Sequence, residues 1–216
     1  MNWVRMSVFD LDRTLVFGNS SFAFCQYLIA RGVLSRTCMG YVALAYVRHV
    51  YFGMSLKLLH EKIFERLLRG KSVKLLESHV EPFVEFYLSH HVNPSALACL
   101  RLAQHLGEYT LILSNAPQFL VGHFARALNV HEWHSTQYAV DSQDQLVEIE
   151  SILQGDEKAA CVRDAMQRLN IAKKDVTAYS DSYLDLPLLL ASGTAVAVNP
   201  DRKLKEFSQQ QNWALK

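Results

Sequence analysis

The sequence predicts an α/β protein with a doubly wound parallel sheet and an inserted helical domain. Short apolar segments alternate with helical segments in the second part of the chain, as in a parallel sheet covered on both faces. A long stretch between the first two apolar segments has helical spacing and no strand pattern. The length of 216 residues is enough for a core domain that carries a smaller insertion. We expect residues 1–16 and 93–216 to form the core and residues 17–92 to form a helical cap.

The first elements follow from the apolar pattern of the N-terminal part. A buried strand is expected from Trp3 to Phe9, a segment rich in Val, Met and Phe that leads into a polar loop at Asp10. Helical spacing then runs from Ser20 to about His91, interrupted by glycines, and Ser72 is a suitable N-cap within it. This stretch is the predicted cap.

Strands and helices alternate in the remaining chain. Each expected strand is a short apolar run, and each expected helix has apolar residues at three- and four-residue spacing. Polar residues at 141–145 indicate the turn of a hairpin. The expected elements are a helix over 97–106, a strand over 109–113, a helix over 119–128, a hairpin over 136–149, a helix over 158–169, a strand over 176–179, a helix over 184–190 and a strand over 195–198.

The charge balance argues against nucleic acid as a partner. Lys and Arg number 22 and Asp and Glu number 21, which gives a formal net charge of +1. Proteins that bind nucleic acid usually carry a basic excess that supplies affinity for phosphates. Half of the residues are hydrophobic, which is typical of a globular protein and not of a disordered chain.

The N-terminus and the cysteines favour a protein of the cytoplasm. No apolar stretch long enough for a signal peptide comes before Asp10. The cysteines Cys25, Cys38, Cys99 and Cys161 are far apart and form no CxxC pair, so neither a zinc site nor a disulfide scaffold is expected. We interpret them as small buried side chains in a reducing compartment.

One stretch approaches the length of a membrane span. Between Thr37 and Leu56 the only formally charged side chain is Arg48. An arginine at the middle of a span costs about 3 kcal/mol, and Gly40 and Gly53 interrupt the segment. We expect buried helices here and no transmembrane segment, with contact at a membrane surface as the alternative.

Polar residues follow three of the expected strands at the point where each strand ends. Ligands of open α/β sheets bind at this edge, at the carboxyl ends of the strands. Clustered carboxylates repel one another unless a cation neutralises them, and an all-oxygen ligand set suits Mg²⁺. These polar residues are Asp10, Asp12 and Thr14 after the first strand, Ser114 and Asn115 after the second, and Asp181 and Asp185 after the strand over 176–179.

This combination of residues suits phosphoryl transfer. A metal ion held by Asp10 and Asp181, with or without Asp185, could bind a phosphate oxygen while Asp10 attacks phosphorus. Asp12 could protonate the leaving oxygen and then activate water, and Ser114 and Lys158 could contact the equatorial oxygens. Each feature alone also has an ordinary structural explanation as a turn, a helix cap or a surface lysine. Their order and their positions after strands together favour a catalytic site.

The sequence resembles the haloacid dehalogenase superfamily of phosphohydrolases in four motifs. The segment Phe9-Asp-Leu-Asp-Arg-Thr-Leu15 is similar to the first motif, DxDx[TV], while Ser114 matches the second and Lys158 the third. The segment Tyr179-Ser-Asp-Ser-Tyr-Leu-Asp-Leu-Pro187 matches the fourth. The helical insertion after the first motif resembles the cap of the branch that contains phosphoserine phosphatase. The resemblance covers nearly the whole chain and implies a Rossmann-like core.

The resemblance also implies a role for each matching residue. Asp10 would be the nucleophile that forms an aspartyl-phosphate, and Asp12 would be the general acid and base. Asp10, the backbone carbonyl of Asp12 and Asp181 would hold Mg²⁺, and Asp185 would support the metal site. The residues that hold the transferring phosphoryl group would be Thr14, Ser114, Asn115 and Lys158.

Departures from the family pattern bear on the substrate. Phosphoserine phosphatases carry a glutamate about where Asn19 stands, and Asn19 cannot supply the charge that pairs with the ammonium group of phosphoserine. Arg13 replaces a commoner small residue, and the sequence offers no account of it. Phe17 and Phe22 are candidates for setting specificity, because the cap is rich in aromatic residues. Since the cap also resembles that of the phosphatidylglycerophosphatase C type, the expected substrate is a small soluble phosphomonoester or, alternatively, a lipid phosphomonoester.

These observations together predict a Mg²⁺-dependent phosphomonoesterase that acts through an aspartyl-phosphate. A phosphotransferase, which passes the phosphoryl group to an acceptor other than water, is the alternative that the sequence leaves open. A non-catalytic binding protein is disfavoured, because decayed sites usually lose Asp10 or Asp181 first and both are present. The sequence indicates no oligomeric state.

Overall fold

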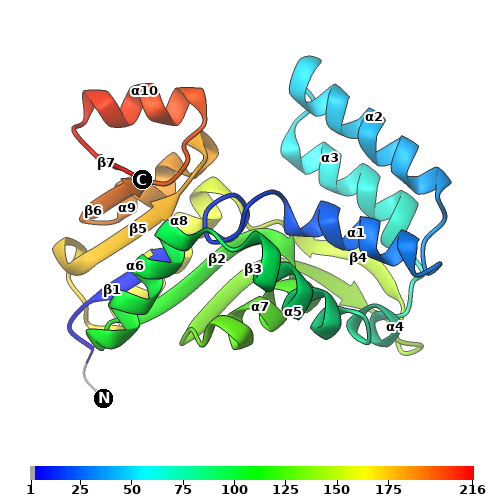
Figure 1. Ribbon diagram of the computed structural model, residues 1–216, viewed down its shortest axis with the longest axis horizontal. Helices are drawn as coiled ribbons and strands as arrows, with labels where there is room; N and C mark the ends of the chain where they lie inside the picture. The colour runs from blue at the N-terminus through cyan, green and yellow to red at the C-terminus, as the bar shows by residue number, and fades with distance from the viewer. Residues whose placement is uncertain (1–2) are drawn as a thin grey trace.

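The strands of the protein form one seven-stranded sheet, in the order β4-β3-β2-β1-β5-β6-β7 (Figure 1). The computed structural model describes residues 3–216, apart from the side chains of Cys38, Met39, Tyr46, His49, Val50 and Leu56, so the expectation for Cys38 lies outside the described residues. Neighbouring strands are parallel except β3 and β4, which form the predicted hairpin. The strands are β1 (Met6–Phe9), β2 (Tyr109–Pro117), β3 (Glu132–Val140), β4 (Leu146–Ser151), β5 (Val176–Ser180), β6 (Thr194–Ala197) and β7 (Ala214–Leu215).

Helices occupy the connections between the parallel strands, so the predicted alternation of strands and helices is confirmed. Before β2 these are α1 (Ser20–Ala30), α2 (Thr37–Tyr51), α3 (Leu56–Ile63), the π-helix η1 (Phe64–Leu68), α4 (Val73–Glu77), α5 (Val80–His91) and α6 (Pro94–His105). After β2 they are α7 (Gln118–Leu128), α8 (Gly155–Leu169), the 3₁₀ turns η2 (Lys173–Asp175) and η3 (Tyr183–Asp185), α9 (Leu186–Ala191) and α10 (Arg202–Gln210).

Side chains that alternate along the strands enter two separate cores. Phe9 and Ile112 belong to a buried cluster with residues of α6 and α7, whereas Val8 and Leu111 belong to a second cluster with residues of α8, α9 and α10. Successive strand residues point to opposite faces, so these two clusters lie on the two sides of the sheet. The predicted doubly wound sheet with both faces covered is therefore confirmed.

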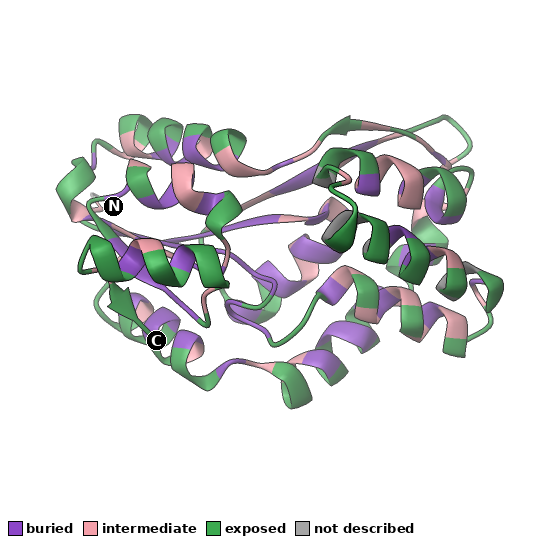
Figure 2. Cartoon of the chain, turned by 90° about the horizontal axis from the view of Figure 1, so that it is seen from above, coloured by how far each residue is buried: buried purple, intermediate pink, exposed green. Residues whose placement is uncertain are grey.

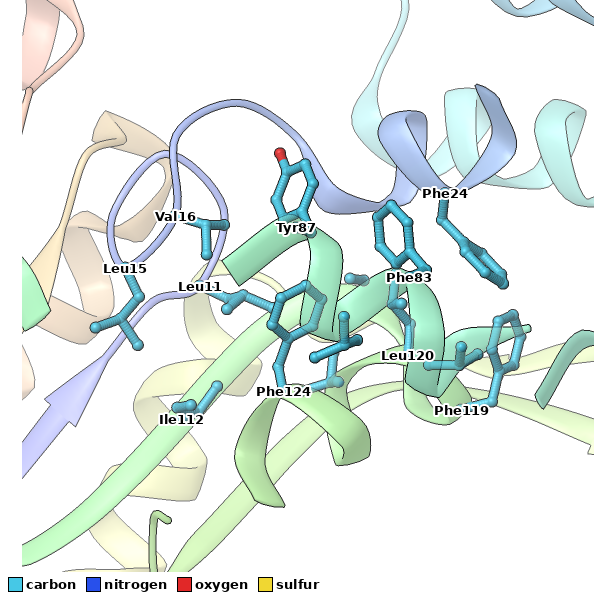
Figure 3. Packing of buried hydrophobic residues seen from close by; sticks show 14 of the residues in the cluster. Leu11, Leu15, Val16, Phe24, Phe83, Tyr87, Ile112, Phe119, Leu120 and Phe124 are labelled. Atoms are coloured by element: carbon cyan, nitrogen blue, oxygen red, sulfur yellow. The ribbon is translucent and has the colours of Figure 1, made fainter. Parts of the chain in front are cut away.

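The helices α1 to α5 lie between β1 and α6 in the chain. Figure 1 shows α2 and α3 as an antiparallel pair at the outer edge of the molecule, farther from the sheet than α1. The insertion shares its hydrophobic cluster with the core, because Phe24 of α1 and Phe83 of α5 pack near Phe119 and Phe124 of α7 (Figure 3). The helical insertion is thus packed against one face of the sheet and not held by a linker alone.

The two chain segments that join the insertion to the core lie side by side. Phe17 N–H donates to the carbonyl of His91 at 2.6 Å, and Asn93 N–H donates to the carbonyl of Leu15 at 2.9 Å. Val16 and Val92 form an antiparallel bridge between these bonds. This crossing coincides with the ends of the predicted cap, whose extent over residues 17–92 stays a prediction.

Several predicted boundaries differ from the structure. The first strand begins at Met6 instead of Trp3, and the helix expected over 184–190 is divided into η3 and α9. The first half of β3, from Glu132, pairs in parallel with β2, whereas no element is predicted there. The helix α10 and the strand β7 have no counterpart in the prediction.

The expectation of buried helices over residues 37–56 is wrong for the outer face of α2. Leu44 is 54% exposed, Tyr51 77% and Phe52 78%. Burial colouring in Figure 2 shows exposed residues along the outer helices, while buried residues lie on the strands and on one side of many helices. Within residues 3–216 no helix combines the length and the apolar character that crossing a bilayer requires.

Candidate active site

The site begins where β1 ends and the chain turns sharply. Asp10 N–H donates to the carbonyl of Tyr179 at 3.0 Å and so continues the ladder between β1 and β5. Three residues later Arg13 adopts a left-handed backbone conformation with φ of 61°, and its N–H donates to the carbonyl of Gly18 at 3.0 Å. This closed turn carries the side chains of Asp10 and Asp12, which are both buried.

A buried lysine connects two of the predicted carboxylates. Lys158 Nζ lies 2.7 Å from Asp10 Oδ1 and 2.8 Å from Asp185 Oδ2. Lys158 comes from the first turn of α8 and Asp185 from η3, so three segments far apart in the sequence meet here. The side chains of Lys158, Asp10 and Asp185 are 3%, 8% and 7% exposed, which keeps these charge-assisted bonds away from bulk water.

Asp12 is held by the beginning of α1. Its Oδ1 accepts a hydrogen bond from the backbone N–H of Ser20 at 2.7 Å, and its Oδ2 accepts one from Asn19 Nδ2 at 3.2 Å. Asn19 also caps α1, since its Oδ1 accepts from the N–H of Phe22 at 2.8 Å. The N-terminus of α1 therefore fixes the orientation of the Asp12 carboxyl.

Asp181 lies at the carboxyl end of β5, next to the turn after β1. Thr14 Oγ1 donates to Asp181 Oδ1 at 3.4 Å, and the carbonyl of Asp181 accepts from the N–H of Asp201 at 2.7 Å. Thr14 itself is fully buried, and its carbonyl accepts from Asn93 Nδ2 at 2.9 Å. These bonds connect the turn, the end of β5 and the N-terminus of α6.

Burial dominates the electrostatics of the carboxyl groups. It raises the pKa of Asp10 well above its ordinary value; Lys158 opposes the rise, while the charges of Asp185 and Asp181 add to it. Burial also raises the pKa of Asp12, against the hydrogen bonds from Ser20. The pKa of Asp181 is raised in the same way to about 7, which Arg13 counteracts. The site therefore favours additional positive charge.

The donor set at this edge fits a divalent cation of the Mg²⁺ type. Asp10 and Asp181 supply carboxylate oxygens, and Mg²⁺ is typically bound by one or two carboxylates while it retains several waters. The described residues contain no group of three or more His, Cys, Asp or Glu side chains arranged to hold a metal. The fit therefore rests on two carboxylates, which suits a hard ion that keeps much of its water shell.

The hydrogen bonds described for the remaining predicted residues are not to the aspartates or to Lys158. Ser114 was expected to follow the strand, but it lies inside β2, which extends to Pro117; it is fully buried, and its Oγ accepts from the N–H of Ala116 at 3.2 Å. Asn115 is half-buried, and its carbonyl accepts from Thr136 Oγ1 at 2.8 Å. Phe17 and Phe22, which flank Asn19 in the sequence, are 46% and 39% exposed. They have no part in the hydrogen bonds described above for the aspartates.

Two serines take part in the site without having been predicted. Ser180 Oγ donates to Asp185 Oδ2 at 2.8 Å, so Asp185 receives hydrogen bonds from both Ser180 and Lys158. Ser20 supplies its backbone N–H to Asp12. A serine at the end of a strand or in the first turn of a helix is common in any sequence, and only its place beside a motif could have pointed to it.

The carboxylates and the lysine meet at the carboxyl edge of a doubly wound sheet, where the active sites of α/β enzymes lie. The model of the haloacid dehalogenase-like hydrolases matches residues 7–190, and the chain belongs to that family. The resemblance seen in the sequence is thereby confirmed. The chain is an enzyme of this family, in which phosphatases generally use Mg²⁺.

Similar curated proteins carry the names of phosphatases. A phosphoserine phosphatase of Mycobacterium tuberculosis is 27% identical over 217 residues, which cover 96% of this chain and 69% of that protein. A probable phosphatase of the same organism is 26% identical over 213 residues, covering 96% and 73%. A histidinol-phosphatase of Neisseria meningitidis is 26% identical over 226 residues, covering 98% of this chain and 97% of that protein.

Solved structures share the fold along almost the whole chain. A protein of unknown function from Bordetella pertussis has a TM-score of 0.79 at 21% identity, and the match covers 99% of this chain and 98% of that one. A phosphoserine phosphatase with bound substrate has a TM-score of 0.72 at 16% identity, covering 94% and 90%. At these identities the structures establish the common fold.

Proposed function

We propose that this hydrolase is a cytoplasmic, Mg²⁺-dependent phosphomonoesterase that forms an aspartyl-phosphate on Asp10. The observation that carries the proposal is the geometry around Asp10, whose Oδ1 lies 2.7 Å from the ammonium of Lys158 at the end of β1. Asp12, two residues further along, is held separately by Ser20 and Asn19. Two carboxyl groups with different partners suit two different roles.

In the first half of the reaction, a carboxylate oxygen of Asp10 attacks phosphorus and the bond to the leaving oxygen breaks. The Asp12 carboxyl gives its proton to that oxygen, which leaves as an alcohol. In the second half, Asp12 accepts a proton from a water whose oxygen attacks phosphorus. This step releases phosphate and regenerates the Asp10 carboxylate.

The other residues supply fixed charge and position. Lys158 would neutralise Asp10 and an oxygen of the phosphoryl group, while Ser114, Thr14 and Asn115 would hold the phosphoryl group in place. Asp10, the carbonyl of Asp12 and Asp181 would hold Mg²⁺, with Asp185 in support. When bound, the ion supplies positive charge to the phosphoryl oxygens.

Hydrolysis of p-nitrophenyl phosphate by the Asp10→Asn variant tests this proposal. We expect activity to fall about a thousandfold or more, because the amide cannot act as the nucleophile. Asp156→Asn, an exposed position in the first turn of the same helix as Lys158, should retain wild-type activity. Asp156→Asn should unfold at the wild-type temperature, and Asp10→Asn should still unfold cooperatively, because Lys158 keeps its ion pair with Asp185. Activity should also disappear with a chelator and return with Mg²⁺, and a fully active Asp10→Asn variant would contradict the mechanism.

We further propose that the substrate is a small phosphomonoester with an apolar portion. Phe17 and Phe22 are exposed around Asn19, whose amide bonds Asp12, so apolar side chains lie close in sequence to the acid. The relatives named phosphoserine phosphatase and histidinol-phosphatase suggest amino-alcohol phosphates, although Asn19 supplies no charge for an ammonium group. A lipid phosphomonoester is the second candidate, favoured by the same exposed phenylalanines.

A substrate panel distinguishes these candidates. It includes phosphoserine, histidinol phosphate, lysophosphatidic acid and phosphatidylglycerophosphate, and we expect a higher kcat/KM for a small substrate than for either lipid. The reverse order would favour the lipid candidate. The same reactions run with glycerol as acceptor separate hydrolysis from phosphotransfer. Glycerol phosphate formed in preference to inorganic phosphate would reassign the enzyme as a phosphotransferase.

A further inference from the structure

The helix α2 exposes apolar side chains on one continuous face. Leu44, Val47, Arg48 and Tyr51 follow the spacing i, i+3, i+4 and i+7, which places them on the same side of a helix. Leu44 is 54% exposed, Val47 42% and Tyr51 77%, whereas Ala45, which lies on the other face, is buried. A surface helix normally turns polar side chains outward, whereas α2 exposes apolar side chains as well as burying them.

The exposed face continues into the connection to α3. Phe52 is 78% exposed and Leu58 41%. We call these five residues, Leu44, Val47, Tyr51, Phe52 and Leu58, the apolar tip. A hollow of about 590 Å³ runs through it, lined by Leu44, Val47, Arg48, Phe52, Met54 and Leu58. Large exposed apolar patches of this kind mark surfaces of interaction.

The chain segment that contains the apolar tip carries charges of one sign only. Between Arg13 and His60 the chain contains no Asp or Glu, and it contains five basic residues, so this segment carries a charge of +5 while the whole chain carries +1. Arg48 and Lys57 are both exposed, and Arg48 lines the hollow. The basic residues are Arg13, Arg31, Arg36, Arg48 and Lys57.

An anionic bilayer surface matches both properties at once. Apolar and aromatic side chains enter the boundary between headgroups and acyl chains, while Arg and Lys contact lipid phosphates. A second copy of this chain fits less well, since a symmetric contact through α2 would bring Arg48 and the same positive segment of each copy together. Charge complementarity therefore selects the lipid surface.

We propose that the apolar tip docks this protein on anionic lipid bilayers. Tyr51 and Phe52 enter the interface, and Arg48 and Lys57 contact lipid phosphates. The contact is peripheral. It is independent of the proposed reaction, because the apolar tip shares no residue with the carboxylate site.

Co-sedimentation with extruded vesicles tests the docking. Wild-type protein should bind vesicles of equal parts phosphatidylglycerol and phosphatidylcholine, and binding should weaken as NaCl rises from about 50 to about 500 mM. Tyr51→Ser/Phe52→Ser should reduce the partition coefficient about tenfold or more, because two exposed aromatic side chains are lost. Arg48→Gln should reduce it about fivefold on these vesicles only, with no change on pure phosphatidylcholine.

The matched control is Leu102→Ser/Leu106→Ser. Leu102 of α6 is 58% exposed and Leu106, the C-cap of that helix, is 59% exposed. Both lie outside the apolar tip. The control should bind vesicles like the wild type, and every variant should hydrolyse p-nitrophenyl phosphate at the wild-type rate, which also shows that it is folded. Full vesicle binding by Tyr51→Ser/Phe52→Ser would overturn the proposal. The proposal would also be overturned if the wild type bound no vesicles and formed a dimer in sedimentation velocity that Tyr51→Ser/Phe52→Ser abolished.

Discussion

Lys158 determines how buried carboxylates can lie close together in this protein. Burial lowers the pKa of its ammonium group, but the charges and hydrogen bonds of Asp10 and Asp185 outweigh that effect and raise it. Lys158 is therefore a permanent cation near neutral pH and not a proton donor. Breaking a buried ion pair of this kind leaves an uncompensated charge, so the lysine has a structural as well as an electrostatic role.

Asn19 links the stability of α1 to the position of the acid. Its Oδ1 accepts from the N–H of Phe22, and its Nδ2 donates to Asp12. Asn19→Ala should lower the free energy of unfolding by about 1 kcal/mol, because the helix cap is lost. It should also lower kcat about tenfold, because the hydrogen bond to Asp12 is lost. Urea unfolding and hydrolysis of p-nitrophenyl phosphate measure the two effects.

Asn19→Ser separates the two roles of this residue. A serine can cap the helix but is too short to reach Asp12, so we expect near-wild-type stability with the same loss in kcat as Asn19→Ala. If Asn19→Ser kept full activity, the bond to Asp12 would have no part in catalysis.

The sequence predicts which side chains lie at this edge of the sheet better than it predicts their contacts. The convergence of Asp10, Asp12 and Asp181 could be predicted, because carboxylates directly after buried strands meet at one edge of a parallel sheet. The bond from Ser180 to Asp185 could not, because which neighbour faces a carboxylate depends on the turn after β5. The two hydrogen bonds of Asn19 could not be predicted from the sequence either, because they depend on how α1 packs against the turn after β1.

Among the elements, β3 shows where pattern-based prediction fails. Its first half contains Glu132 and His134 in place of an apolar run, so no strand was expected there. Arg168 of α8 donates to both carboxylate oxygens of Glu132, at 2.7 and 2.8 Å, and Tyr109 of β2 also donates to one of them. Ion pairing between distant segments thus stabilises a strand that its own sequence does not indicate.

These contacts make β3 sensitive to pH. They lower the pKa of Glu132 to about 2 against the effect of burial, with the hydrogen bonds from Arg168 and Tyr109 as the main causes. A depressed folded-state pKa contributes stability above the unfolded value, about 4.3, and this contribution is lost as pH falls toward 2. Glu132→Gln should therefore cost about 2 kcal/mol at pH 7, allowing for solvent screening at the half-exposed Arg168, and clearly less at pH 3.5.

Urea unfolding at the two pH values measures this difference. Glu150→Gln, at an exposed position of β4, is the control and should change the free energy of unfolding by less than about 0.5 kcal/mol at pH 7. An equal cost of Glu132→Gln at pH 7 and pH 3.5 would mean that packing, and not charge, holds β3 in place.

Other elements differ from expectation for related reasons. The alternation of β1, β2 and β5 with helices could be predicted, since strands buried on both faces are continuous apolar runs. The helix α10 carries mostly polar side chains and buries Leu204 and Ser208, a signal too weak for an apolar pattern, although Asp201 caps it. The apolar residues of α2 predicted burial because composition does not reveal whether a partner covers a face.

At the scale of the whole molecule, the insertion and the core are joined through one crossing of the chain. Gly18 lies in this crossing, and its carbonyl accepts from Arg13 N–H in the turn that carries Asp10 and Asp12. Tyr87 of α5 donates to the carbonyl of Phe17 at 2.7 Å, so a helix of the insertion holds the same segment. We therefore expect a change in the position of the insertion to move the turn of the site.

Gly18→Ala tests this coupling. Gly18 has a φ of +80°, and a Cβ there would lie 3.3 Å from the hydroxyl oxygen of Tyr87. Backbone strain should cost about 1 kcal/mol of stability, and displacement of Tyr87 and of the turn should lower kcat/KM about tenfold. Gly32→Ala is the matched control, because Gly32 has a φ of +75° but nothing within 4 Å of its Cβ position. It should lose similar stability in urea unfolding and keep its activity toward p-nitrophenyl phosphate. Both variants place a Cβ at a positive φ, and only Gly18→Ala also contacts Tyr87. Equal activities of the two variants would therefore show that the insertion and the catalytic turn move independently.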